Sequence, residues 1–183
     1  MFIQTEDTPN PSTVKFLPGR TVYSQGSEEF NNKEDAQRSP LATRLFEIEG
    51  IKSILFGADF ISVTKTGSYE WFLLKPLILE TLVHYLASHS KIEIKPHQES
   101  VMPPEDLDNI SKEIIELLDS KIRPAVAMDG GDIIFDRFEE GIVYLKMKGA
   151  CSGCPSSTMT LKSGIENMLR YYVPEVQEVR AIE

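Results

Sequence analysis

The chain of 183 residues is poor in cysteine, with only Cys151 and Cys154. A secreted domain that disulfide bonds hold together needs several cysteine pairs, so this class of protein is excluded. Two cysteines also exclude a four-thiolate metal site built within a single copy of the chain. In a reducing cytoplasm, a cysteine pair more often binds metal or does redox work than forms a structural disulfide.

Basic charge and long apolar runs are also scarce. The 19 Lys and Arg residues are outnumbered by 28 Asp and Glu, which gives a net charge of −9. This balance argues against a general nucleic-acid binder and against an anionic membrane surface as partner. No apolar stretch approaches the roughly 20 residues of a membrane-spanning helix. The N-terminal residues 1–7 are acidic and contain no Arg, so we expect no signal or transit peptide and a cytoplasmic location.

The composition, 41% hydrophobic and 26% charged, is that of an ordinary globular protein. Three prolines and no apolar periodicity mark residues 96–106 as a flexible linker. We therefore predict two small α+β domains, residues 1–95 and 107–183. The first carries 10 basic and 12 acidic side chains, and the residues from 96 onward carry 9 and 16, so most of the negative charge lies in the C-terminal half.

The first domain is expected to mix short strands with two helices. Ser39 is the expected N-cap of the first helix, with Pro40 in its first turn and Gly50 at its end. A second helix is expected to begin at Pro76. The polar stretch 26–35 is expected to be a loop. The expected strands are Phe2–Thr5, Thr13–Leu17, and the hairpin of Ile51–Phe56 and Phe60–Lys65.

The second domain is expected to follow the order α-β-β-α with a final edge strand. Apolar residues at helical spacing predict a helix over 107–122, and Pro124 is expected to stop it. A turn at Asp129-Gly130-Gly131-Asp132 then leads into the strands, because paired glycines tolerate positive φ. The remaining expected elements are strands 133–135 and 142–147, a helix after Pro155, and an edge strand over 176–182.

The chemistry-bearing motif is Cys151-Ser152-Gly153-Cys154, placed between a predicted strand and a predicted helix. The positive end of that helix favours the thiolate form, which binds metal or attacks as a nucleophile. Four interpretations fit the spacing: a thioredoxin-like dithiol, half of a zinc site, an inert buried pair, and half of an iron–sulfur site. Iron–sulfur clusters are generally held by four thiolates, so the last interpretation needs a second copy of the chain.

The chain resembles the Nfu family, the NifU-like iron–sulfur scaffold and carrier proteins. The C-terminal half matches this family's pattern at Arg123-Pro124, at Asp129–Asp132 and across 149–158. The N-terminal half matches the family at Thr8-Pro9-Asn10-Pro11, Lys15-Phe16, Ser39–Ala42, Trp71 and Leu74–Pro76. The resemblance covers nearly the whole chain and is closest to the two-domain bacterial and mitochondrial type.

The resemblance implies that Cys151 and Cys154 bind the iron of a [4Fe–4S] cluster shared by two subunits, in preference to a [2Fe–2S] cluster. It implies a carrier and not an enzyme, working as a homodimer in the cluster-bound form. Its implied partners are upstream cluster-assembly proteins and client apoproteins such as lipoyl synthase or aconitase. The N-terminal domain is expected to bind partners or to regulate, without cluster ligands, and the implied location is the cytoplasm of a bacterium.

The other matching residues have simpler expected roles. Asp129–Asp132 is expected to set turn geometry, Arg123-Pro124 to end a helix, and Trp71 to lie in the core. His84 and His89 are five residues apart, which puts them on different faces of a helix. We therefore expect them to be ordinary surface or partly packed residues and not metal ligands.

Overall fold

The computed structural model describes residues 2–95, 108–153 and 155–182, and at 155–158 the backbone only. The chain divides into two compact units, residues 1–98 and 99–183. Each unit combines helices with its own sheet, which confirms the two-domain α+β class. The predicted linker, 96–106, lies outside the described residues.

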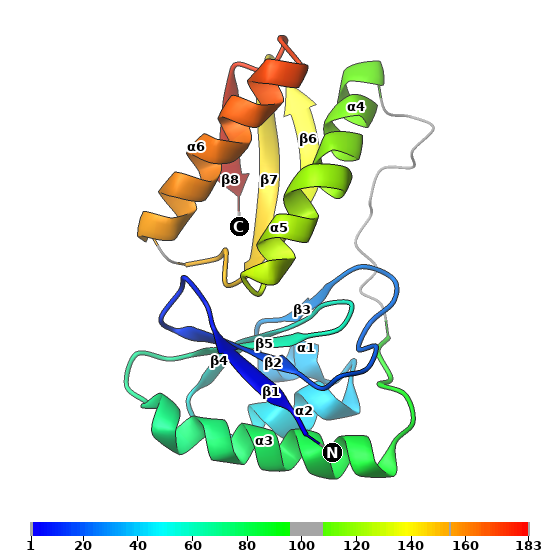
Figure 1. The fold of residues 1–183 in the computed structure, drawn as a ribbon, viewed down its shortest axis with the longest axis vertical. Coiled ribbons are helices and arrows are strands. Elements are labelled where there is room, and N and C mark those ends of the chain that lie inside the picture. The colour runs from blue at the N-terminus through cyan, green and yellow to red at the C-terminus, as the bar shows by residue number, and fades with distance from the viewer. Residues whose placement is uncertain (1, 96–107, 154, 183) are drawn as a thin grey trace. The chain divides into compact units, whose positions relative to one another are not determined.

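The first unit is a five-stranded antiparallel sheet in the order β1-β2-β5-β4-β3. Its three helices lie along one face of the sheet (Figure 1). Its elements are β1 (Gln4–Asp7), β2 (Thr13–Leu17), β3 (Glu28–Phe30), α1 (Lys33–Ala36), α2 (Pro40–Phe46), β4 (Ile51–Phe56), β5 (Ile61–Lys65) and α3 (Trp71–Ser88).

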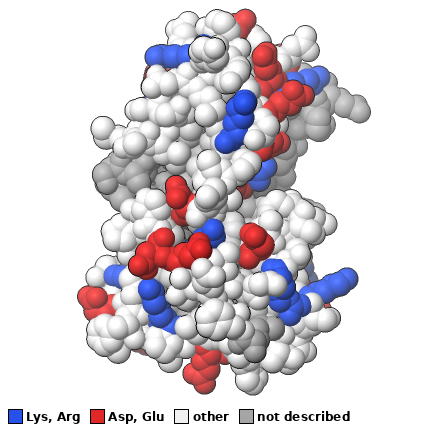
Figure 2. Space-filling view, viewed as in Figure 1, with Lys and Arg blue, Asp and Glu red and all other residues white. Residues whose placement is uncertain are grey.

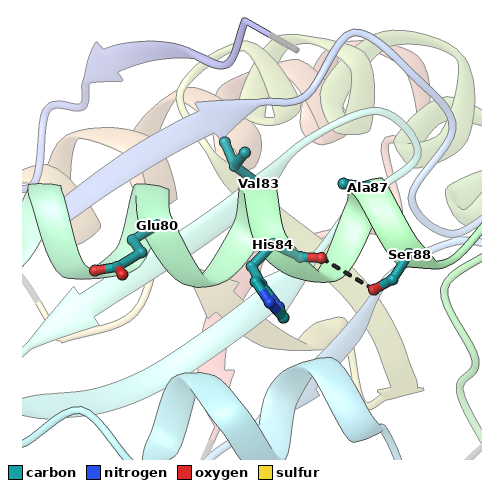
Figure 3. Close-up of a pocket in the computed structure, with 5 residues that line it drawn as sticks. All are labelled: Glu80, Val83, His84, Ala87 and Ser88. Carbon is teal, nitrogen blue, oxygen red and sulfur yellow. Dashed lines mark hydrogen bonds between the residues drawn. The ribbon is translucent and has the colours of Figure 1, made fainter.

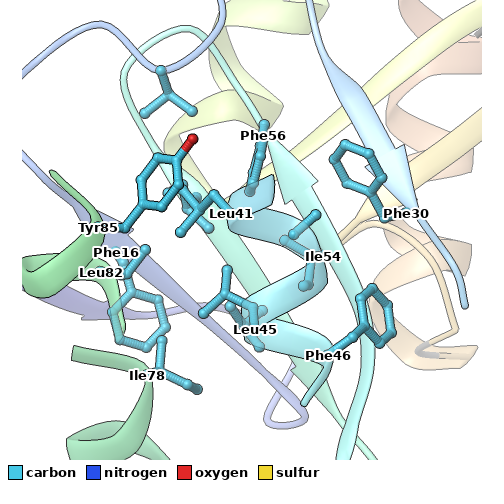
Figure 4. Packing of buried hydrophobic residues seen from close by; sticks show 14 of the residues in the cluster. Phe16, Phe30, Leu41, Leu45, Phe46, Ile54, Phe56, Ile78, Leu82 and Tyr85 are labelled. Atoms are coloured by element: carbon cyan, nitrogen blue, oxygen red, sulfur yellow. The ribbon is translucent and has the colours of Figure 1, made fainter. Parts of the chain in front are cut away.

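The core of this unit follows from the alternation of side chains along its strands. In β2, Val14 and Phe16 point to the helices, and both are at most 1% exposed. The hairpin places Ile54 opposite Val63 in the same layer. Figure 4 shows Phe16 and Ile54 packed against α2 and α3, whose contributions to the core include Leu41, Leu45, Ile78, Leu82 and Tyr85.

Two expectations for this unit are wrong. The stretch 26–35 is not a loop, because it contains β3 and most of α1. Arg38 bonds to Glu28 and Asp35 and lies 4.8 Å above the Phe30 ring, so a cation from outside the stretch holds it in place. The second helix begins at Trp71 and not at Pro76, since a proline in the second turn removes only one helical hydrogen bond.

Helix α2 starts at Pro40 as predicted but ends at Phe46, before Gly50. Ser39 occupies the N-cap position, and its carbonyl accepts from the Thr43 N–H at 2.9 Å. Its buried hydroxyl makes no cap hydrogen bond and finds no partner among the described residues. The expected position of the cap is therefore right, while the expected role of the serine hydroxyl is not.

The second unit is a three-stranded sheet in the order β6-β7-β8, with its helices on one face (Figure 1). The β6–β7 pair is an antiparallel hairpin with Glu140 and Gly141 at positive φ in its turn, and β8 joins β7 in parallel. Its elements are α4 (Asn109–Leu117), the π-helical turn η2 (Leu118–Ile122), α5 (Arg123–Met128), β6 (Gly131–Glu139), β7 (Ile142–Gly149), α6 (Pro155–Tyr172) and β8 (Glu178–Ile182).

Pro124 does not stop the first helix of this unit, which corrects the prediction. The π-helical turn η2 comes first, and the Arg123 N–H donates to the Leu118 carbonyl five residues back. The wider turn absorbs the proline, which has no N–H and would clash with a carbonyl of a regular α-helix. The chain therefore continues as α5 to Met128.

No described helix is both long and apolar enough to cross a membrane. On the face shown in Figure 2, Lys and Arg side chains are scattered among acidic ones and form no continuous basic band. This distribution agrees with the acidic composition of the chain.

Candidate functional site

Cys151 lies two residues after the end of β7, at the end of the second unit where α5 ends and α6 begins. The Ala150 N–H donates to the Gly130 carbonyl at 3.2 Å, which ties the cysteine loop to the turn before β6. Cys151 is 6% exposed and belongs to the apolar core of the unit. The second predicted ligand, Cys154, lies outside the described residues.

Gly131 provides the space that Cys151 occupies. A Cβ atom built on Gly131 would lie 2.3 Å from the Cys151 Sγ, far inside van der Waals contact. In the structure, therefore, the thiol side chain rests against the glycine backbone and points into the unit. The close approach gives a structural role to the second glycine of Asp129–Asp132, whereas the first, Gly130, makes the turn with φ of 77°.

Within the motif itself, Gly153 has φ of 79°, a conformation that favours glycine. Helix α6 begins two residues later, at Pro155. Proline suits the first helical position because its missing N–H would have no helical partner there. The structure thus confirms that a helix follows the cysteine motif, with its positive end toward the loop.

The two polar motifs of the second unit bind each other. The Arg123 Nε and Nη2 atoms donate to the two carboxylate oxygens of Asp132 at 2.9 and 2.8 Å. The Ile133 N–H donates to the same carboxylate at 2.8 Å. Asp132 is 5% exposed, so this bidentate pair supplies the compensation that a buried carboxylate requires.

Arg123 also joins the helices to the sheet. Its two hydrogen bonds to Asp132, and to a lesser degree its one bond to Asp119, raise its pKa above the ordinary arginine value, so it remains fully charged. The bond to Asp119 joins Arg123 Nη1 to Asp119 Oδ1 at 2.9 Å, one turn earlier in the same helical segment. Because the positive charge of Arg123 compensates the carboxylate of Asp132, the start of β6 brings no unpaired negative charge toward the Cys151 loop.

The sequence reasoning missed the Arg123–Asp132 pair. Arg123 was expected to end a helix and Asp132 to shape a turn, yet Asp132 lies inside β6. The residues are nine apart, a separation that matches neither helical nor strand periodicity, so no local pattern joins them. The available signal was that both motifs lie in the cysteine-bearing half.

The N-terminal motifs also meet one another. The Trp71 Nε1 donates to the Pro11 carbonyl at 2.9 Å, and Lys75 lies 3.1 Å from Asp7. Trp71 is half-buried against the first core, which supports its expected structural role. These contacts fasten the start of α3 to the β1–β2 turn, so the motifs build the domain.

The two histidines in the described part of the chain, His84 and His89, form no constellation. Figure 3 shows His84 on α3 beside Glu80 in a shallow hollow, with its carbonyl accepting from Ser88 Oγ at 3.0 Å. His89 instead stacks on Tyr85, with ring centroids 4.1 Å apart. Within residues 2–95, 108–153 and 155–182, no three His, Cys, Asp or Glu side chains gather as a metal site.

Comparison with known proteins agrees with this two-part structure. Residues 3–89 match the family described as scaffold protein Nfu/NifU N terminal, and residues 114–180 match the NifU-like domain. The chain is 48% identical over 183 residues to the human protein named NFU1 iron-sulfur cluster scaffold homolog, mitochondrial. That match covers all of this chain and 72% of the human protein.

The chain belongs to the Nfu/NifU family of iron–sulfur cluster scaffold proteins. A relative of the same name from Drosophila sechellia is 46% identical over 185 residues, and this chain spans 65% of its length. A solution structure of a NifU-like protein from Saccharomyces cerevisiae aligns at 27% identity with a TM-score of 0.49, over 52% of this chain and 87% of that one.

Membership of the Nfu/NifU family confirms the resemblance that the sequence motifs indicated. In family terms, the first unit is the Nfu N-terminal domain and the second is the NifU-like domain, which contains Cys151. The Arg123–Asp132 pair and the Cys151–Gly131 contact both lie within the NifU-like match.

Proposed function

We propose that this protein binds a [4Fe–4S] cluster between two subunits, through Cys151 and Cys154 of each, and transfers it to client apoproteins. The observation that carries the proposal is the single cysteine pair of an iron–sulfur scaffold family member, in a loop between β7 and α6. Each copy supplies two thiolates, and a cluster of this type is held by four. The ligand set is therefore completed by a second copy.

The surroundings of Cys151 suit this cargo. Thiolates are the soft donors that iron–sulfur clusters use, and the start of α6 presents its positive end to an anionic cluster. The Arg123–Asp132 pair removes the repulsion that a bare carboxylate would exert there. Since the Cys151 thiol points inward against Gly131, cluster binding requires this side chain to turn outward.

The proposed role is that of a carrier and not of an enzyme. Client thiolates would replace Cys151 and Cys154 on the iron one after another, so the cluster passes over by ligand exchange. Upstream assembly proteins would supply it, and apoproteins such as lipoyl synthase and aconitase would accept it. The N-terminal unit, which has no cysteine, would bind partners and not the cluster.

Anaerobic reconstitution with iron and sulfide tests the proposal. The loaded protein should be brown, should contain roughly four irons per dimer, and should dimerise as it takes up the cluster. Cys151→Ser and Cys154→Ser should each abolish cluster binding, whereas the loop control Ser152→Ala should retain it. A full cluster on the Cys151→Ser protein would show that the ligand assignment is wrong.

The same preparations separate the rival functions. A colourless monomer that reduces insulin disulfides would indicate a thioredoxin-like dithiol oxidoreductase. A protein that binds zinc tightly but no iron would indicate a zinc-stabilised interaction module. A content of two irons per dimer would indicate a [2Fe–2S] cluster in place of the [4Fe–4S] cluster.

The proposed location is a reducing compartment, because the thiolates must stay reduced to hold iron. The sequence favoured the cytoplasm of a bacterium, whereas the relatives from Homo sapiens and Drosophila are named as mitochondrial proteins. Fractionation of the source cells, with an antibody to this chain, decides between the two locations.

A further inference from the structure

One end of the second unit gathers the features of the cysteine loop. The turn after α5, the start of β6 and the end of β7 meet there, because the Ala150 N–H bonds to Gly130 and Cys151 rests on Gly131. Helix α6 also begins at this end (Figure 1). A second copy that supplies the missing thiolates must approach this end.

Two exposed methionines flank the cysteine loop. Met128, the last residue of α5, is 76% exposed, and Met159, one turn into α6, is 72% exposed. The other large apolar side chains described as exposed in this unit are Tyr171 and Tyr172. Those lie at the opposite end of α6, 12 and 13 residues beyond Met159 and therefore about 18–20 Å from it along the helix axis.

Methionine fits a contact that forms and dissolves. Its side chain is unbranched, flexible and polarizable, so it packs against varied surfaces without a fixed shape. Two-fold symmetry would bring the same end of each copy together, so each methionine would enter the contact twice. An apolar rim would also keep water away from a bound cluster, as the apolar shell around a metal site does.

We propose that Met128 and Met159 form the apolar rim of a two-fold contact with a second copy of this chain, closing around the shared cluster. This inference rests on the proposed function, because the four-thiolate requirement is what identifies the second copy as the occupant. It assigns the apolar contact to the end that carries Cys151, and it leaves Tyr171 and Tyr172 outside the contact.

The test measures dimerisation of the full chain reconstituted anaerobically with iron and sulfide. The variants are Met128→Lys and Met159→Lys, with the milder Met128→Gln and Met159→Gln as second versions. Tyr171→Lys is the matched control, because Tyr171 is 80% exposed and receives the same charge at the far end of α6. Sedimentation velocity gives the dissociation constant of the coloured dimer, and circular dichroism of the apoproteins verifies folding.

Each lysine variant should raise the dissociation constant of the loaded dimer at least about tenfold. Loss of one buried methionine changes this constant by about that factor, and each substitution is present in both copies. The glutamine variants should weaken it less, and the Tyr171→Lys control should stay within about twofold of the wild type. Iron content per Cys pair should fall at low protein concentration in the methionine variants, because the cluster is lost when the dimer separates.

Two results would overturn the inference while the proposed function stands. One is a wild-type dimer constant in all methionine variants at full cluster content. The other is equal weakening by Tyr171→Lys, which would indicate a general charge effect. A wild-type protein that takes up no cluster, or holds one as a monomer, would instead overturn the proposed function and the inference with it.

Discussion

Replacement of Gly131 by alanine tests the inward position of the Cys151 thiol. The added Cβ would lie 2.3 Å from the Cys151 Sγ and 3.0 Å from both the Cys151 nitrogen and the Lys148 carbonyl oxygen. Non-bonded atoms prefer about 3.5–4 Å, so the thiol must move by at least about 1 Å. Overpacking of this kind costs about 1–3 kcal/mol.

The cheapest relief is rotation of the thiol out of the core. If the clash raises the free energy of the state with an inward thiol by about 1.4 kcal/mol, the population of the state with an outward thiol increases about tenfold. We therefore expect Gly131→Ala to lower the unfolding free energy of the second unit by about 1–3 kcal/mol. We also expect alkylation of Cys151 to become about tenfold faster.

Two measurements on the full chain check this expectation. Hydrogen exchange of the β6 and β7 amides reports local stability of the second unit, while fluorescence of the single tryptophan, in the first unit, serves as an internal control. Alkylation is measured in a Cys154→Ser background, where Cys151 is the remaining thiol. Gly164→Ala is the matched glycine control, because its Cβ would meet no atom within 4 Å.

Gly164 lies in α6, so its replacement should leave the unit unchanged or stabilise it by up to about 1 kcal/mol. If Gly131→Ala leaves both the exchange of β6 and β7 and the alkylation rate at wild-type values, the inward thiol position is wrong. If it lowers stability without faster alkylation, the strain has gone into the backbone near Lys148 instead.

Three further predictions concern single polar groups. Arg123→Lys should destabilise the second unit by about 1–3 kcal/mol, because lysine cannot make both bonds to the buried Asp132; unchanged exchange of β6 would contradict this. Asp108 caps α4, and the hydrogen bond from the Ser111 N–H holds the pKa of its carboxyl below the usual range. The contribution of the ionised cap to the stability of the second unit is therefore present at neutral pH and is lost as the pH falls through the lowered pKa. Asp108→Ala should therefore cost about 1 kcal/mol at pH 7 in urea unfolding, and this difference should shrink as the pH falls through the lowered pKa of Asp108, whereas Asp108→Asn should keep most of the cap at neutral and at acidic pH. Ser39→Ala should stabilise the first unit by up to about 1 kcal/mol, because it removes a buried hydroxyl without a described partner; a loss of stability would mean that the hydroxyl caps α2 after all.

Local sequence patterns predicted the elements that carry their own signal. Alternating apolar residues gave β2 and the β4–β5 hairpin, and the motif before Pro155 gave the start of α6. Tertiary contacts held the elements that were missed. Strand β3 has two glutamates and a single fully buried residue, so its sequence does not indicate a strand. It is held in the sheet by its pairing with β4 and by the ion pair of Glu28 with Arg38.

The predicted helix boundaries at two prolines are wrong for the same reason. Pro76 and Pro124 were expected to open or stop a helix, yet both lie inside helical chain. A proline removes one hydrogen bond and creates one steric problem, and packing of the surrounding helix against a core can outweigh both. At Pro124, a π-helical turn precedes the proline and avoids the clash, and this turn is followed directly by Arg123, which binds Asp132 on β6.

The sequence by itself determined the family, the two-part α+β organisation and the count of two cysteines for each chain, because all three depend on residue identity and order. The tertiary structure decided what surrounds Cys151. Its buried position against Gly131, the neutralisation of Asp132 by Arg123, and the exposure of Met128 and Met159 depend on distances between segments far apart in the chain. No periodicity records such distances, since they exist only after the helices have packed against the sheet.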